Sequence, residues 1–497
     1  EMLRSLVGSE MCIRDSLQCC TLISGFVIPR IILTYFGSNV NGLVSSLNQF
    51  LSYITLVEGG ISGVIIANLY KPLVDGDNDK LSSVMVTSDR FYKKIGCIFI
   101  VYSVALACLY PVIFKQEFSY LYVASLTIVL SINLLIQYMF SLTLKNLLTA
   151  DKKTYIVNFT QMAITLSNIV LAVISVWIYP SIHFLKLISG CLFLLQPVIF
   201  KSYSNKNYKI NWKAKIDNSL IKERWNGFAI NFAAFIHNCT DIAILTIFTD
   251  LKTVSIYSVY SLVSNGLKQL INASITGISA TVGQAYAKNN YDELNRKLDI
   301  YEYVVFLLVF FIFTVAALLI TPFVQIYTNG VNDTNYCQPY FGVLLLISEA
   351  LYLVKFPHMS LAYNANKFKE ITVPSFIEAG LNIVISVALV HKLGLVGVTI
   401  GTIVGMSYRT IFHVYFTSKI IPDRKQNIFY VKFFSFTVVA IVGFLICYIF
   451  FPLEEISLLY WIKYAVIYSI IIGCLYAALS VIFFKKELKF FVKYLTK

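Results

Sequence analysis

The sequence is poor in charged residues: Asp, Glu, Lys and Arg make up 13% of its 497 residues, whereas 58% are hydrophobic. Soluble globular domains carry about 25% charged residues, because their surface faces water. This composition therefore excludes a soluble globule. Apolar stretches that are each long enough to cross the hydrocarbon core of a bilayer follow one another along the chain, which predicts a polytopic membrane protein.

Signatures of cofactor sites and catalysis are also missing. The ten cysteines are scattered singly apart from Cys19 and Cys20, and only Cys337 falls in a predicted outer loop, so neither a disulfide framework nor a zinc site is expected. The chain contains no P-loop, nucleophile elbow or H-E-x-x-H motif. We therefore expect no enzymatic activity, no cofactor and no metal site.

Three alternating acidic residues, Asp75, Asp77 and Asp79, have the spacing that begins a calcium-binding loop. Lys80 stands where that loop requires Gly, which argues against calcium. We interpret the segment as a solvated inner loop.

The apolar segments predict an all-helical protein with about fourteen transmembrane spans. The last two spans hold only Lys463 as a charge at membrane depth. The predicted spans lie at about residues 17–36, 42–69, 94–114, 118–142, 155–179, 182–200, 227–248, 254–285, 301–327, 338–363, 371–390, 394–418, 430–451 and 458–484.

The loops that join these spans alternate between rich and poor in Lys and Arg. Basic loops stay in the cytoplasm, so the alternation predicts that both termini are cytoplasmic and leaves only Lys115, Lys252 and Lys392 outside. The net charge of +14 lies in short stretches beside the membrane. Anionic lipid headgroups suit such stretches, so we expect contact with membrane lipids and no binding of nucleic acid.

The longest inner loop divides the spans into two sets of six. We expect a first six-helix bundle at 17–200, a cytoplasmic linker at 201–225, a second six-helix bundle at 226–420, and a pair of additional helices with a basic tail at 421–497. The end of the second span, Asn68–Leu81, weakly resembles the end of the eighth, Gly283–Leu294. Parallel repeats of this kind place the substrate site of a transporter at their interface.

Residues 1–16 match nothing that follows. They are polar, lack the apolar core of a signal peptide, and include the string SLVGSEMCIRDS, which looks like translated adapter sequence. We expect these residues to be non-native and the true N-terminus to be missing.

One motif carries a family resemblance. It consists of P-R-I-I-L-T-Y-F-G at Pro29–Gly37, N-G-L followed by V-E-G-G within Asn41–Gly63, and L-Y-K-P-L at Leu69–Leu73. It resembles the polysaccharide biosynthesis flippases, which export O-antigen and related lipid-linked oligosaccharides and belong to the multidrug/oligosaccharidyl-lipid/polysaccharide (MOP) superfamily. The motif covers about residues 29–95, and the resemblance in span number and topology extends from Leu17 to the C-terminus.

The resemblance implies a MATE-like fold and a location in the bacterial inner membrane. It also implies that an undecaprenyl-pyrophosphate-linked oligosaccharide is carried from the inner to the outer leaflet by alternating access, beside other polysaccharide assembly proteins. Pyrophosphate and a hydrated glycan do not cross hydrocarbon unaided, so such a carrier needs a polar, cationic cavity.

Charges within the predicted spans are the candidate site residues, because a charge in the membrane is costly unless it has a function. We predict that four cations line a pyrophosphate site: Arg30, Lys268, Lys355 and Arg409. We assign gating or ion coupling to four further residues: Glu58, His237, Asp241 and Glu378.

Two features bear on these assignments. Arg30 and Lys355 lie beside Pro29 and Pro357, which predicts helix breaks at both cations. Internal ion pairing, for example between Lys268 and Asp241, is the alternative to a role in binding.

Three other functions compete with the flippase. A cation-coupled drug exporter of the same superfamily would favour an acidic residue in the first span, where this chain has Arg30. A membrane-embedded polysaccharide polymerase would need a sizeable outer loop, and the longest predicted one has only about ten residues. A membrane scaffold would not need so many intramembrane cations.

Overall fold

The computed structural model describes residues 2–58, 60–113, 117–217, 235, 239–422 and 424–495. These residues form helices and connecting loops and contain no β-strand, which confirms the prediction of an all-helical protein. The chain divides into two compact units, Glu1–Phe235 and Ile236–Lys497. Each unit is described by itself below.

Ten helices among the described residues are long and apolar enough to cross a membrane. α15 (Phe368–Ile420) contains two predicted spans, and α1 (Met2–Ser52) contains the first span and the start of the second; in each helix a residue with non-helical backbone angles interrupts the helix. Gly37 (φ 80°) divides α1, and Gly394 (φ 53°) divides α15, close to the predicted boundaries between spans. A positive φ is strained for residues with a Cβ, so glycine permits both kinks. The chain is therefore a polytopic membrane protein.

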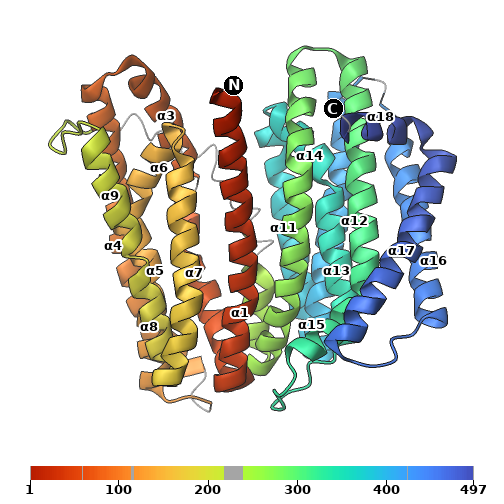
Figure 1. The fold of residues 1–497 in the computed structure, drawn as a ribbon, viewed down its shortest axis with the longest axis horizontal. Coiled ribbons are helices and arrows are strands. Elements are labelled where there is room, and N and C mark those ends of the chain that lie inside the picture. Colours follow the sequence, from red (N-terminus) through yellow and green to blue (C-terminus); the bar gives the residue numbers. More distant parts are fainter. Residues whose placement is uncertain are drawn as a thin grey trace. The chain divides into compact units, whose positions relative to one another are not determined.

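Unit 1 is a bundle in which α1 packs against α7, α4 against α5, and α8 against both α5 and α7 (Figure 1). Its core includes the fully buried side chains of Tyr92, Phe99 and Phe200. Its helices are α1 (Met2–Ser52), α2 (Thr55–Glu58), α3 (Ile61–Asp75), α4 (Asn78–Ile113), α5 (Tyr120–Ile136), the π-helical turn η1 (Gln137–Ser141), α6 (Leu142–Ala150), α7 (Thr154–Ile178), α8 (Ile182–Leu192) and α9 (Leu195–Asn207).

The predicted acidic inner loop joins α3 to α4. Asp77 accepts a hydrogen bond on Oδ1 from the backbone N–H of Lys80, at 3.0 Å. This bond lowers the pKa of the Asp77 carboxyl. Asp75 ends α3, and Asp79 lies in the first turn of α4, where a negative charge favours the helix dipole.

Unit 2 is arranged around α12, which packs against α11, α13, α16 and α17 (Figure 1). The short terminal helix α18 packs on α12 and α17. The helices are α11 (Leu251–Ala287), α12 (Tyr291–Tyr327), α13 (Pro339–Val354), α14 (Phe356–Asn364), α15 (Phe368–Ile420), α16 (Asn427–Phe450), α17 (Leu458–Phe483) and α18 (Lys485–Leu495), and a shorter apolar helix, Cys239–Phe248, precedes them.

The two arms of α15 pack tightly against each other around Gly394. A Cβ atom on Gly401 would lie 2.2 Å from Ser386 Oγ and 2.8 Å from the backbone oxygen of Asn382. A Cβ atom on Gly405 would lie 3.0 Å from the backbone oxygen of Glu378. Small residues at such an interface let helix backbones approach closely within a membrane. The approach brings polar residues of the first arm next to the second.

Candidate functional site

Three of the four predicted cations come together in unit 2, in a group that we call the cationic cluster. Lys268 comes from α11, Lys355 lies at the junction of α13 and α14, and Arg409 comes from the second arm of α15. The cluster comprises Lys268, Glu349, Tyr352, Lys355, Glu378 and Arg409.

Each cation of the cluster has a carboxylate partner. Lys268 Nζ lies 3.0 Å from Glu349 Oε2. Glu378 lies between the other two cations, with Oε1 3.6 Å from Lys355 Nζ and Oε2 3.1 Å from Arg409 Nη1. Both oxygens of Glu378 therefore face a positive charge.

An aromatic ring links the two halves of the cluster. Lys355 Nζ lies 4.6 Å from the centre of the Tyr352 ring, and Lys268 Nζ lies 5.3 Å from it. Both distances allow a favourable cation–π interaction. The Tyr352 ring thus contacts both ammonium groups and stabilises each of them.

The guanidinium of Arg409 is held by further contacts. Its Nε donates a hydrogen bond to His413 Nε2 at 2.8 Å, and its Nη1 donates one to Ser375 Oγ. Both partners are buried. His413 and Ser375 therefore orient the guanidinium of Arg409 together with Glu378.

The charged side chains of this cluster are largely buried, so an imbalance of charge among them costs free energy. The side chains of Lys355, Arg409 and Glu378 are 3%, 4% and 8% exposed, and those of Lys268 and Glu349 are each 12% exposed. Within these six residues three cations face two carboxylates, which leaves one positive charge in excess in the cluster itself. A buried excess charge is costly, and an anionic ligand would offset it.

Asp241 lies in a separate polar group of unit 2. Its carboxylate accepts hydrogen bonds from the Tyr257 hydroxyl at 2.9 Å and from Thr402 Oγ1 at 3.1 Å. Thr402 also contacts Asn382, and Ser386 donates to Asn382 Oδ1 and to a backbone oxygen, that of Val398. The partner of Lys268 is therefore Glu349, whereas Asp241 bonds with hydroxyl groups. His237 lies outside the described residues.

The sequence analysis missed Glu349, Asn382, Ser386 and Thr402. A signal was available on α15, where Glu378, Asn382 and Ser386 follow one another at intervals of four residues in an apolar helix. This spacing places polar side chains on one helix face.

The remaining two predicted site residues belong to unit 1. Arg30 lies half-buried on α1, which continues through Pro29, so the predicted break beside Arg30 is wrong and the kink lies at Gly37 instead. The corresponding prediction for Lys355 is confirmed, because α13 ends at Val354 and α14 begins at Phe356.

Glu58 lies at the end of α2, where the second predicted span is interrupted. It accepts hydrogen bonds from Ser62 Oγ at 2.7 Å and from the Tyr138 hydroxyl at 3.3 Å. Ser62 in turn contacts the Tyr92 hydroxyl, which accepts a hydrogen bond from Asn146. Glu58 thus connects the break between α2 and α3 to α4, α6 and the π-helical turn.

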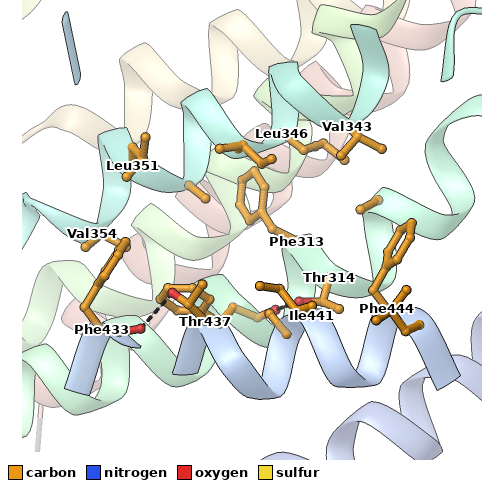
Figure 2. Close-up of a pocket in the computed structure, with 16 residues that line it drawn as sticks. Phe313, Thr314, Val343, Leu346, Leu351, Val354, Phe433, Thr437, Ile441 and Phe444 are labelled. Carbon is orange, nitrogen blue, oxygen red and sulfur yellow. Dashed lines mark hydrogen bonds between the residues drawn. The ribbon is translucent and has the colours of Figure 1, made fainter. Parts of the chain in front are cut away.

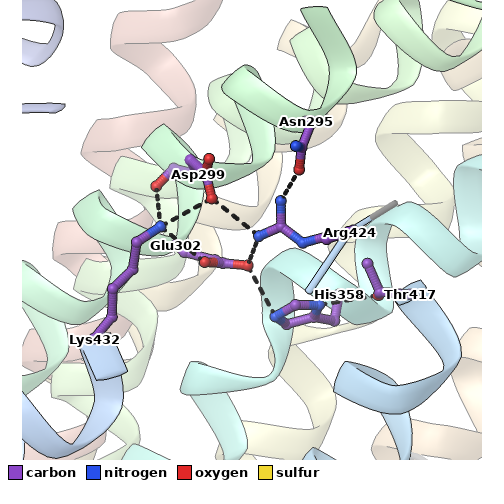
Figure 3. A network of polar contacts seen from close by, with 7 residues as sticks. All are labelled: Asn295, Asp299, Glu302, His358, Thr417, Arg424 and Lys432. Atoms are coloured by element: carbon purple, nitrogen blue, oxygen red, sulfur yellow. Dashed lines mark hydrogen bonds and ion pairs between the residues drawn. The ribbon is translucent and has the colours of Figure 1, made fainter. Parts of the chain in front are cut away.

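A second charged group in unit 2, the Glu302 cluster, was not predicted (Figure 3). Glu302 is fully buried on α12 and contacts Lys432 Nζ at 3.0 Å, Arg424 Nη2, and His358 Nε2 at 3.1 Å. Asp299 lies 3.0 Å from Lys432 Nζ and 3.1 Å from Arg424 Nη2. Two acids thus face two bases, and the cluster joins α12 to α14, α16 and the α15–α16 connection.

The Glu302 cluster also ties the last two helices to the rest of unit 2. Lys432, near the start of α16, is buried at 3% exposure, whereas Lys463 is exposed. Lys432 is therefore the lysine of this pair that contacts α12.

Unit 2 also contains an apolar cavity of about 390 Å³ between α12, α13 and α16 (Figure 2). Phe310, Phe313, Leu346 and Phe433 are among the residues that line it. Its two threonines donate their hydroxyls to backbone oxygens of their own helices, as Thr314 does to Phe310. The cavity suits hydrocarbon and offers no charge to a phosphate.

Comparison with known proteins identifies the fold. No protein-family model and no curated protein sequence matches the chain. Among solved structures, the lipid II flippase MurJ in an inward closed conformation matches with a TM-score of 0.75 at 12% identity, and the match covers 95% of this chain and 100% of MurJ.

Drug transporters match as well. An inward-facing multidrug resistance MATE family transporter of the MOP superfamily matches with a TM-score of 0.63 at 12% identity, covering 82% of this chain and 98% of the transporter. The MATE multidrug transporter DinF-BH matches with a TM-score of 0.61 at 14% identity, and the match covers 86% of this chain and 96% of DinF-BH. The chain thus has the fold that MurJ and MATE transporters share.

Proposed function

We propose that the protein is a flippase that moves an undecaprenyl-pyrophosphate-linked oligosaccharide from the inner to the outer leaflet of the bacterial inner membrane by alternating access. The cationic cluster is the observation that carries this proposal, because it places an excess positive charge among membrane-spanning helices. The fold supports it, since the match with a lipid II flippase extends over nearly the whole chain.

The chemistry of the substrate explains the residues. A pyrophosphate that leaves water loses its hydration, and cations with fixed geometry replace part of it. Lys268 is the least buried cation of the cluster and is suited to first contact with the headgroup. Arg409 offers paired N–H donors to phosphate oxygens, and Lys355 adds a point charge. We assign Arg30, in unit 1, to the same substrate.

The coupling site in this proposal is Asp241. Its carboxylate accepts hydrogen bonds from the hydroxyl groups of Tyr257 and Thr402, and a carboxylate with hydroxyl neighbours suits either a proton or a sodium ion. His237 is a further candidate on the same segment. Glu58, at an interrupted helix, is the proposed gate of unit 1.

Orientation and partners belong to the same proposal. The alternation of basic and non-basic loops supports a cytoplasmic location for both termini. The substrate is made at the inner leaflet and used at the outer one, so other polysaccharide assembly proteins would act before and after this carrier.

Cation-coupled drug export is the second candidate, because MATE transporters share the fold. The two functions differ in the charge of the substrate, and a cluster with an excess positive charge favours an anion over a cationic drug. A membrane polysaccharide polymerase is less favoured, since the matched structures are a flippase and transporters.

Reconstitution of the purified protein into proteoliposomes tests the proposal. Fluorescent undecaprenyl-pyrophosphate disaccharide should become accessible at the opposite leaflet faster than in protein-free vesicles. Cationic dyes should not be accumulated. If the dye moves and the lipid does not, the drug-exporter function replaces the flippase. In cells, deletion of the gene should leave the lipid-linked intermediate in the inner leaflet with its synthesis intact.

A further inference from the structure

We infer that Glu378 occupies the place of the anionic headgroup when the carrier is empty, and that the pyrophosphate displaces it from Lys355 and Arg409 during transport. This inference rests on the proposed function. It adds that the Glu378 carboxylate competes with the pyrophosphate for the same two cations.

The geometry around Glu378 is that of an anion site already occupied. One carboxylate oxygen faces Lys355 at 3.6 Å and the other faces Arg409 at 3.1 Å. A phosphate presents paired oxygens in the same way, and Arg binds carboxylates and phosphates through the same donors. The Glu378 carboxylate and a substrate phosphate would therefore compete for the same position between Lys355 and Arg409.

The cations do not depend on Glu378 alone for their position. Arg409 is held by His413 at 2.8 Å and by Ser375, and Lys355 lies over the Tyr352 ring at 4.6 Å. If Glu378 turned away, both cations would still point at the vacated place. An incoming phosphate would then meet a preformed site rather than build one.

Burial explains why an empty carrier needs such a residue. Lys355 and Arg409 are 3% and 4% exposed, so two cations without a counter-ion would be strongly destabilised. A carrier must return empty after releasing its substrate, and Glu378 neutralises the site during that return. Glu349 stands in the same relation to Lys268, at 3.0 Å.

The exchange of anions predicts an unusual phenotype. Removing the charge of Glu378 removes the competitor, so Glu378→Gln should bind the headgroup more tightly than wild type, by about tenfold or more. The same variant should be slow in net flipping, because the empty site then carries two unpaired cations. Exchange of labelled for unlabelled substrate should continue, since exchange requires no empty return.

Glu302→Gln is the matched control. Glu302 is also a buried carboxylate between a Lys and an Arg, at 3.0 Å from Lys432 Nζ and in contact with Arg424, but its cluster is charge-balanced with Asp299. Its loss should lower stability without raising affinity. Glu378→Asp, which keeps the charge, should bind close to wild type.

The experiment measures affinity and both modes of flipping in nanodiscs and proteoliposomes. Undecaprenyl pyrophosphate and inorganic pyrophosphate are the two probes. The affinity of Glu378→Gln should rise by the same factor for both, because the contact is with phosphate, while only the lipid is flipped. A rise for the lipid alone would mean that Glu378 contacts another part of the substrate, and would overturn the inference.

Two other results separate failure of the inference from failure of the proposed function. If wild type neither binds nor flips undecaprenyl pyrophosphate, the proposed function fails. If wild type does both, but Glu378→Gln binds no more tightly and loses exchange and net flipping equally, Glu378 holds the helices together and competes with no ligand. If Glu378→Gln does not fold, equal affinity of Glu378→Asp and wild type supports the inference, and a large loss of affinity in Glu378→Asp contradicts it.

Discussion

Arg409 and Glu378 lie on opposite arms of α15, and their ion pair, with 3.1 Å between Nη1 and Oε2, joins the two arms of the kinked helix. The pair can form only because the arms approach closely at Gly401 and Gly405. The glycines that shape the fold and the charges that are proposed to bind the substrate are therefore parts of one local structure.

Gly401→Ala is expected to destabilise the protein and to weaken transport. The new Cβ would lie 2.2 Å from Ser386 Oγ and 2.8 Å from backbone oxygen, so the arms must separate, at about 1–3 kcal/mol. Apparent melting temperature in detergent measures the effect. Gly380→Ala is the control on the same helix, because its Cβ would meet nothing within 4 Å. Equal melting temperatures for Gly401→Ala and Gly380→Ala would show that the two arms of α15 do not pack tightly at Gly401.

Lys268→Ala and Arg30→Ala are expected to lose flipping, and Lys268→Ala is also expected to lower stability, because it leaves the largely buried Glu349 without its partner. Each removes a charge-assisted contact of about 1.5–3 kcal/mol, which corresponds to roughly a 10- to 150-fold weaker affinity for the headgroup. Arg30→Lys should keep part of the activity, since charge remains but paired donors are lost. Lys252→Ala, at the start of the same helix as Lys268, should be active. Full complementation by the double Ala variant at normal expression would remove both residues from the site.

Asp241→Asn is expected to abolish the dependence of transport on the ion gradient while binding of the lipid remains. Asparagine can still accept the hydrogen bonds from Tyr257 and Thr402, but it has no negative charge that could bind a proton or a sodium ion. Flipping is measured in vesicles with an imposed sodium gradient and, separately, an imposed pH gradient. A variant that still responds to the same gradient as wild type would place the coupling ion elsewhere.

Lys432→Met is expected to lower stability by about 3–5 kcal/mol, because it leaves the fully buried carboxylate of Glu302 and the partly exposed one of Asp299 with one cation fewer. The pair Lys367–Glu370, whose side chains are 45% and 44% exposed, supplies the control. Lys367→Met should change stability by less than about 1 kcal/mol. Similar losses in both variants would mean that burial adds nothing to the Glu302 cluster.

Thiol labelling in intact cells tests the orientation. Cys337 is exposed in the connection between α12 and α13 and should react with an impermeant maleimide. Cysteines introduced at Asn205 and Asn427, both exposed, should be protected until the cells are permeabilised. Asn205 serves better than its neighbour Ser204, which is buried. Labelling of Asn205→Cys from outside would reverse the assignment.

Helices and the boundaries between spans could be predicted from the sequence more readily than contacts. Hydropathy locates the spans, and the division of α1 and α15 at Gly37 and Gly394 agrees with it because glycine permits the kink. The sequence predicted Lys355 and Arg409 as separate candidate site residues, because each is a charge within a predicted span. Their shared partner, Glu378, depends on the folding of α15 back on itself, and hydropathy contains no information about that contact.

The Glu302 cluster shows a different limit of sequence reasoning. Asp299 and Arg424 fall outside the predicted spans, and Lys432 falls near the end of one, so each is expected to be solvated. Arg424 and Lys432 are buried because they pack against Glu302 on α12, whereas Asp299 stays 26% exposed. Packing of this kind is a property of the tertiary structure.

The Glu302 cluster has a consequence for biosynthesis. The ribosome makes Glu302 well before it makes Arg424 and Lys432, so α12 is inserted before the counter-charges of this buried carboxylate exist. Glu302 lies at the edge of the predicted span 301–327, so its insertion costs less than the roughly 2.5–3.5 kcal/mol of an acidic residue at the centre of a helix. The start of α12 is therefore expected to stay in contact with water until α16 arrives, and Glu302 is expected to become buried only at that late step of assembly.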